Sequence, residues 1–161
     1  MRRPAAVLVI LVATALAGCG FQLQRGASLP SALKPLRVEA EETQSEFYHA
    51  LRIQLEDAGA DPDAAGADAA VLHILRDGTA ERVLSVSGRN VPTEYELSYT
   101  VRIAVSAGGH ELMPAEDLTL TRDYSFDETA LLAKQRERDA LADALARDLA
   151  SMVMRRLASL H

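Results

Sequence analysis

A run of strict alternation between residues 94 and 105 constrains the fold of this 161-residue chain more than any other feature. Apolar residues occupy every odd position from Tyr95 to Val105, and polar or small residues occupy the even positions. A period of two places successive side chains on opposite faces of a strand and does not fit a helix. At about 3.4 Å per residue such a strand is roughly 40 Å long. This is long for a small domain, so we expect its ends to project beyond the body.

Three other segments are predicted to be strands of the same sheet. Residues 36–40 alternate, and residues 70–86 begin with a near-continuous apolar run that indicates burial on both faces. The loop at 87–93 would then be the projecting tip between two long strands. The glycine pair at 108–109 predicts a tight hairpin turn into the last strand. Pro114 interrupts that strand and fits an edge or bulge position.

Two amphipathic segments are predicted to be helices. Apolar residues form one face of residues 45–58, and Thr43 or Ser45 is suited to cap the start of this helix. A second helix is expected to open near Asp127, and its apolar stripe lapses over 134–138, where the chain is solvated or faces something polar. The order β-α-β-β-β-α predicts an α+β fold. We expect a two-layer sandwich in which a four-stranded mixed sheet packs against two helices.

The N-terminus has the pattern of an export signal. Arg2 and Arg3 precede an apolar run of roughly 13 residues, which has the length of a signal-peptide core and is too short to span a bilayer. The run ends at Leu16-Ala17-Gly18-Cys19, which resembles the lipobox of bacterial lipoproteins. In that class the signal is removed before the cysteine, which then carries an S-diacylglycerol and an N-acyl chain. The alternative is an ordinary secretory signal with a chance cysteine.

These features predict a signal peptide at 1–18, a lipidated tether at 19–35 and one α+β domain at 36–161. The mature chain has 143 residues, enough for a substantial core. Because Cys19 is the only cysteine, we expect the domain to be held together by packing without an internal disulfide. The mature chain has 15 basic and 23 acidic residues, a net charge of −8. This charge argues against a nucleic-acid or anionic-membrane binder, so an anionic ligand must meet a local basic patch.

The sequence contains no evident catalytic or metal-binding motif. Its histidines lack the spacing of metal ligands; they are His49, His73, His110 and His161. We expect His73, in a buried-looking strand, to be a hydrogen-bonded structural residue. No glycine-rich phosphate loop, nucleophile elbow or paired carboxylates with an evident role are present. The sequence therefore predicts a protein that is not an enzyme, with no metal and no cofactor beyond the lipid on Cys19.

Several stretches together resemble the LptE family of lipopolysaccharide-assembly lipoproteins. They are Cys19–Leu23, Leu29-Pro30, Arg89-Asn90 before Glu94–Leu97, Arg122–Tyr124 and Leu131–Lys134. These stretches occur in the family's order and cover nearly all of the mature chain. One departure is Gln24, which separates Leu23 from Arg25 where the family has leucine, arginine and glycine in succession.

The resemblance implies a lipid-anchored protein of the Gram-negative outer membrane. Such a protein plugs the β-barrel protein LptD in a 1:1 pair, helps it assemble, and takes part in inserting lipopolysaccharide into the outer leaflet. Arg89 and Lys134 match basic positions of the family pattern and are the first candidates to bind lipopolysaccharide, whose phosphates favour charge-assisted hydrogen bonds. Arg82, Arg136 and Arg138 are supporting candidates.

The alternative function is a free-standing ligand-binding or chaperone lipoprotein that faces the periplasm. A barrel plug should carry polar contact surface on several faces and should co-purify with a large barrel. A free binder should instead have an apolar pocket and behave as a soluble monomer once its lipid is removed.

Overall fold

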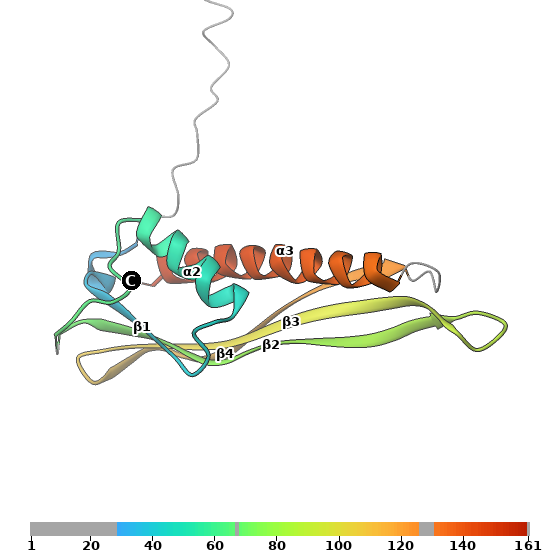
Figure 1. The fold of residues 1–161 in the computed structure, drawn as a ribbon. Helices are drawn as coiled ribbons and strands as arrows, with labels where there is room; N and C mark the ends of the chain where they lie inside the picture. The colour runs from blue at the N-terminus through green and yellow to red at the C-terminus, as the bar shows by residue number, and fades with distance from the viewer. Residues whose placement is uncertain (1–28, 67, 126–130, 161) are drawn as a thin grey trace, which may run out of the picture.

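The computed structural model describes residues 29–66, 68–125 and 131–160, shown in Figure 1. The elements are η1 Ser31–Leu33, β1 Leu36–Ala40, α2 Glu46–Asp57, β2 Ala70–Val86, β3 Pro92–Ala107, β4 His110–Ser125 and α3 Leu131–Ala158. The order confirms the predicted β-α-β-β-β-α arrangement and the α+β class.

The four strands form one mixed sheet in the order β1-β2-β3-β4. β1 runs parallel to β2, and the two later pairs are antiparallel. Along β2, β1 reaches only residues 70–74, whereas β3 pairs with β2 from Val71 to Val86. The β2–β3 hairpin therefore extends far beyond β1, as Figure 1 shows, and the prediction of a projecting tip is confirmed.

Both helices cover the same face of the sheet, so the two-layer sandwich is confirmed (Figure 1). The odd-numbered residues of β3 point into the core, where Leu97, Val101, Ile103 and Val105 are fully buried. They meet the apolar stripes of α2 and α3, whose fully buried members include Phe47, Leu51, Leu55, Leu149, Val153 and Leu157. Burial of these side chains is the main stabilising contribution, at about 1.5–3 kcal/mol for each large apolar side chain.

Ser45 fixes where α2 begins. Its hydroxyl accepts from the backbone N–H of Tyr48 at 3.0 Å, which confirms one of the two predicted caps. The same hydroxyl bonds the carboxylate of Asp77 on β2, so the cap also ties the helix start to the sheet. Leu29 and Leu33, which precede β1, are buried with the core residues.

The turn and the irregularity predicted for β4 are both confirmed. Gly108 and Gly109 have φ of 56° and 79°, values that favour glycine at both centres of a tight hairpin turn. β4 pairs Met113 with Val105 but Glu116 with Ile103, so the register shifts across Pro114. Pro114 thus lies at a bulge in an edge strand, where its missing N–H costs no ladder bond of a central strand.

Several predictions concern residues outside the described ones. They are the signal peptide at 1–18, the lipidated Cys19, most of the predicted tether at 19–35, and the Asp127 cap. Within the described residues, neither α2 nor α3 combines the length and apolarity that a membrane-crossing helix requires.

Candidate functional site at the hairpin end

The candidate residues gather at one end of the molecule, which we call the hairpin end. It comprises the β2–β3 tip at 87–91, the strand residues next to it, and the first described turns of α3 (Figure 1). The tip is closed by two backbone hydrogen bonds, from Ser87 N–H to Val91 O at 2.7 Å and from Asn90 N–H to Ser87 O at 2.9 Å. Asn90 adopts φ 61°, which asparagine tolerates better than most residues. Arg89 is exposed on this tip, and no ion pair engages it among the described residues.

Lys134 lies against the hairpin. Its ammonium nitrogen is 3.9 Å from the centre of the Tyr95 ring, a cation–π geometry. Tyr95 in turn stacks on Tyr124 of β4, with ring centres 5.6 Å apart and planes inclined by 17°. A cation–π contact contributes about 0.5–2 kcal/mol, depending on desolvation. The structure thus brings Lys134 to β3, near the tip that carries Arg89.

A carboxylate on β2 completes this contact between helix and sheet. The Tyr124 hydroxyl donates to Glu81 Oε2 at 2.5 Å, and Arg138 Nε lies 3.4 Å from the same oxygen. Burial, together with the Glu81 carboxylate, raises the pKa of the Tyr124 hydroxyl above its usual value. The lapse of the apolar stripe over 134–138 therefore has a physical cause, because this turn of α3 faces a tyrosine pair and a carboxylate.

Arg82 lies on the opposite face of the sheet from Lys134 and Arg138. Its guanidinium donates two hydrogen bonds to Glu96, from Nε to Oε1 at 2.7 Å and from Nη2 to Oε2 at 3.1 Å. Arg82 lowers the pKa of the Glu96 carboxyl, mainly through these hydrogen bonds. Glu96 alternates with Tyr95 and Leu97, so it points to the face that the helices leave open. Arg136 is exposed on α3.

The remaining polar candidates have structural partners. Nε2 of His73 lies 3.1 Å from Ser106 Oγ, and its Nδ1 is 3.3 Å from a Glu39 carboxylate oxygen. This confirms the hydrogen-bonded structural role expected for His73. In the described part of the chain, no group of three or more histidine, cysteine or acidic side chains is placed to hold a metal ion.

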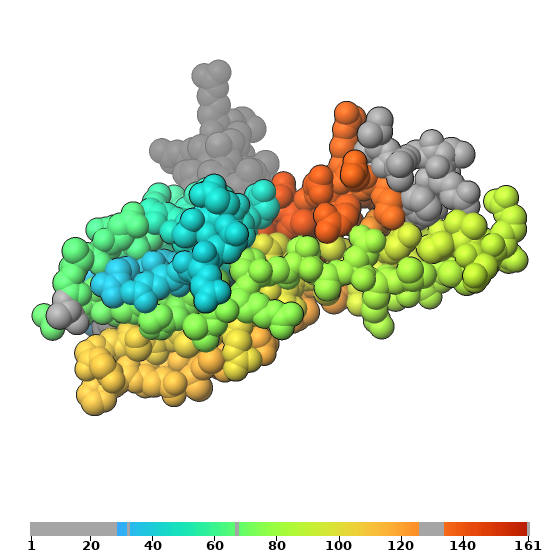
Figure 2. All heavy atoms as spheres, turned by 60° about the horizontal axis from the view of Figure 1, so that its bottom comes forward, coloured from blue at the N-terminus to red at the C-terminus, as the bar shows by residue number. Residues whose placement is uncertain are grey.

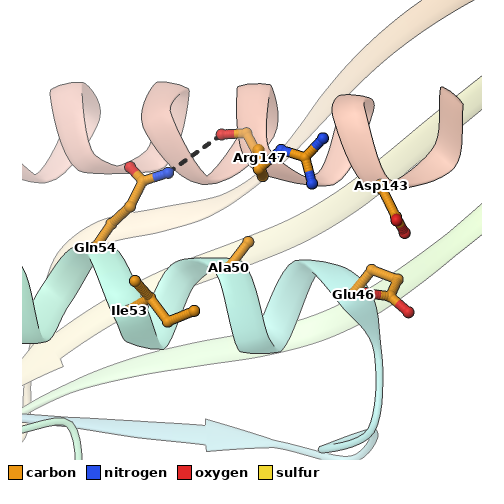
Figure 3. A pocket seen from close by; sticks show the side chains of 6 residues that line it. All are labelled: Glu46, Ala50, Ile53, Gln54, Asp143 and Arg147. Carbon is orange, nitrogen blue, oxygen red and sulfur yellow. Dashed lines mark hydrogen bonds between the residues drawn. The ribbon is translucent and has the colours of Figure 1, made fainter. Parts of the chain in front are cut away.

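A shallow groove between α2 and α3 is the structure's counterpart to the pocket expected of a free ligand binder (Figure 3). Figure 3 shows Ala50 and Ile53 on the α2 side, with Asp143 and Arg147 on α3. Gln54 Nε2 donates to Arg147 O at 3.2 Å across one end of the groove. Most of the lining surface is apolar, and Glu46, Asp143 and Arg147 add charged groups to it. The groove is open to solvent, whereas a small-molecule site usually encloses most of its ligand.

The basic residues are evident in the sequence, but the groups that hold Lys134 and Arg138 are not. The sequence places Tyr95 on an apolar strand face, but it gives neither Tyr124 nor Glu81 a role in holding a basic residue. The signal available in the sequence was their joint position near the start of β3, the end of β4 and the distal part of β2. Only the register in which the strands pair shows that these three side chains meet.

Comparisons with a family model, with sequence relatives and with solved structures agree on one family. The family model described as LptE, lipopolysaccharide-assembly, matches residues 33–157. An LPS-assembly lipoprotein LptE of Yersinia pestis is 24% identical over 160 residues, which cover 96% of this chain and 77% of the relative. The crystal structure of the rare lipoprotein B from Shewanella oneidensis has a TM-score of 0.70 and 27% identity over 78% of this chain and 94% of its own.

A second solved structure agrees in fold. The minor lipoprotein from Acinetobacter baumannii has a TM-score of 0.67 at 21% identity, covering 81% of this chain and 94% of its own. The family model spans β1 through nearly all of α3, including every strand of the hairpin end. The chain therefore belongs to the LptE family of lipopolysaccharide-assembly lipoproteins.

Proposed function

We propose that this chain is anchored through lipid on Cys19 in the outer membrane and plugs an LptD β-barrel in a 1:1 pair. In this role it helps the barrel assemble and takes part in inserting lipopolysaccharide into the outer leaflet. The observation that carries the proposal is the family match over 33–157, because it includes the whole hairpin end. The described residues add a physical reason: the open sheet face is polar, as a plug against a hydrated barrel lumen requires.

We propose Arg89 and Lys134 as the first contacts to lipopolysaccharide phosphates. Arg89 is exposed at the tip, and Lys134 is held beside the same hairpin by the Tyr95 ring. A phosphate that reaches both groups would gain charge-assisted hydrogen bonds despite the acidic balance of the chain. Arg138 lies four residues after Lys134 on the same face of α3 and would extend this basic surface, whereas Arg136 lies on the exposed side of the helix. Arg82 would reach a ligand only across the other face of the hairpin.

The first experiment is a mild-detergent pull-down of the tagged, lipidated protein from its own envelope, followed by mass spectrometry. The proposal expects a stoichiometric partner of barrel size. A protein that is monodisperse alone, without such a partner, would refute the plug and favour the free-standing binder. The groove beside Ile53 would then be the surface to examine for that second function.

The second experiment reverses charge at the hairpin end. The double variant Arg89→Asp/Lys134→Asp should bind lipopolysaccharide at least tenfold more weakly, because two favourable phosphate contacts become repulsive. The matched control, Arg37→Asp/Arg102→Asp, makes the same charge change away from the tip, on β1 and on the part of β3 that pairs with Arg76. Equal loss in both variants would mean that net charge, and not the hairpin end, governs binding.

A further inference from the structure

The distal half of β2 is an open sheet edge. β1 ends at Ala40, opposite Ile74, and from Leu75 to Val86 the described residues provide β3 as the only neighbouring strand. In Figure 2 the green atoms of β2 leave the blue and cyan N-terminal elements and run on toward the hairpin tip along one flank. Along such an edge, every second residue directs its N–H and C=O away from the sheet, so the edge is a template for another strand.

Exposed apolar side chains concentrate on the same edge. Six large hydrophobic residues of the described chain are strongly exposed, and four of them are on distal β2: Leu75, Val83, Leu84 and Val86, at 49%, 48%, 40% and 52%. Register shifts flank Leu75 and occur again near Leu84, and between them the pairing with β3 is regular from Arg76 to Val83. The regular stretch is long enough to pair with one additional strand of ordinary length.

The charges along this edge select the occupant. Asp77 and Glu81 point to the helix side of the sheet, whereas Arg76 and Arg82 point to the open side. A second copy of β2 added antiparallel would place acid opposite acid on one side and arginine opposite arginine on the other, which is destabilising. Arg82 and Glu81 keep their partners Glu96 and Arg138 within the chain, whereas Arg76 has no ion pair among the described residues. The edge therefore favours a different strand, one that places an acidic residue beside Arg76 on the open side.

We propose that distal β2, from Leu75 to Val86, receives an extended segment of the barrel partner as an added strand. The inference rests on the proposed partnership and names the surface that forms it. Backbone hydrogen bonds along Arg76 to Val83 would give affinity, and the complementary charges would set register. The exposed apolar residues near the two ends would be covered by the same segment.

The test places single prolines along the edge, as Gly78→Pro, Thr79→Pro and Ala80→Pro. Successive residues direct their N–H groups to alternate sides. A proline at a residue whose N–H points to β3 therefore removes a ladder bond and lowers the melting temperature. A proline at a residue whose N–H points away from β3 leaves the ladder intact and blocks only the open edge. The proline variants that leave the melting temperature unchanged, which we call melt-neutral, should reduce the barrel protein recovered in the pull-down by at least tenfold.

The controls separate this inference from the proposed function. Prolines at Thr119, Leu120 and Thr121 make the same changes on β4, the other edge of the sheet, and their melt-neutral member should retain the barrel. A melt-neutral β2 proline that also retains the barrel would overturn the inference while leaving the plug intact. A wild-type chain that recovers no barrel would refute both.

A charged variant keeps the inference testable if every β2 proline lowers the melting temperature. Val86→Lys leaves all backbone groups in place and adds a charge where the partner's apolar residues would pack. It should also lower barrel recovery at least tenfold, whereas Ile53→Lys, at a similarly exposed apolar position on α2, should not. Unchanged recovery with Val86→Lys would overturn the inference.

Discussion

Removing the Tyr124 hydroxyl should measure how firmly α3 is docked on the hairpin end. This hydroxyl donates to Glu81 Oε2 at 2.5 Å, and Glu81 also faces Arg138. A hydrogen bond to a charged group contributes about 1.5–3 kcal/mol net. The Glu81 side chain is 28% exposed and keeps its arginine, so we expect Tyr124→Phe to lower the free energy of unfolding by the smaller figure, about 1.5 kcal/mol.

The assay is thermal and urea denaturation followed by far-ultraviolet circular dichroism, because the chain contains no tryptophan. A loss of this size should lower the melting temperature by about 5 °C for a domain of this length. The Glu81→Gln variant and the double variant complete a cycle, whose coupling energy should be about 1 kcal/mol for two groups in direct contact.

Tyr48→Phe is the matched control. The Tyr48 hydroxyl accepts from Arg52 at 3.3 Å, and Arg52 keeps two shorter hydrogen bonds to Asp63. We therefore expect Tyr48→Phe to change stability by less than about 0.5 kcal/mol. If Tyr124→Phe were equally mild and showed no coupling to Glu81, the reasoning that the polar turn of α3 is held by this cluster would be refuted.

Two further predictions concern pH and the core. Tyr99 and Tyr124 have pKa values raised mainly by burial, so the folded protein keeps both protons above pH 10, where an unfolded tyrosine loses its own. Stability should be complete below about pH 10 and fall above it by about 1.4 kcal/mol per pH unit for each tyrosine; a stability independent of pH between 9 and 11 would contradict this. Leu97→Ala should cost about 2–5 kcal/mol because Leu97 is fully buried. The control Leu112→Ala, at a 40% exposed position, should cost less than about 1 kcal/mol in the same denaturation experiment.

Local patterns of the sequence were sufficient for most of the fold. The alternation around Leu97 identified β3, Ser45 was one of two candidate caps for α2, and Pro114 indicated an edge or bulge position. Each of these signals acts over a few residues, because a strand's period, a helix cap and a missing N–H are properties of the local backbone.

The arrangement of the candidate site depends on register, which the local patterns leave open. Arg82 and Lys134 were grouped as basic candidates, yet the sheet lies between them. The face on which Arg82 lies follows from its pairing with Glu96, and a slip of one residue would have turned it to the face that the helices cover. Counting residues back from the hairpin loop does not give the Arg82–Glu96 pairing, because bulges near Leu84 shift the register between this pair and the tip.

The two ends of α3 are held by different interactions, apolar packing at one end and polar contacts at the other. This difference affects how the hairpin end would engage a ligand. From Leu145 to Leu157 the helix is fixed by fully buried apolar side chains, whereas Lys134 and Arg138 are held by a ring and a carboxylate. Polar contacts at the surface are weaker and exchange with solvent more readily than core packing. In the proposed function, Arg89 would meet a phosphate without breaking an ion pair of the described residues, whereas Lys134 would have to loosen its contact with the Tyr95 ring, which contributes about 0.5–2 kcal/mol. Engagement should therefore begin at Arg89, and the first turns of α3 should adjust without disturbing the core.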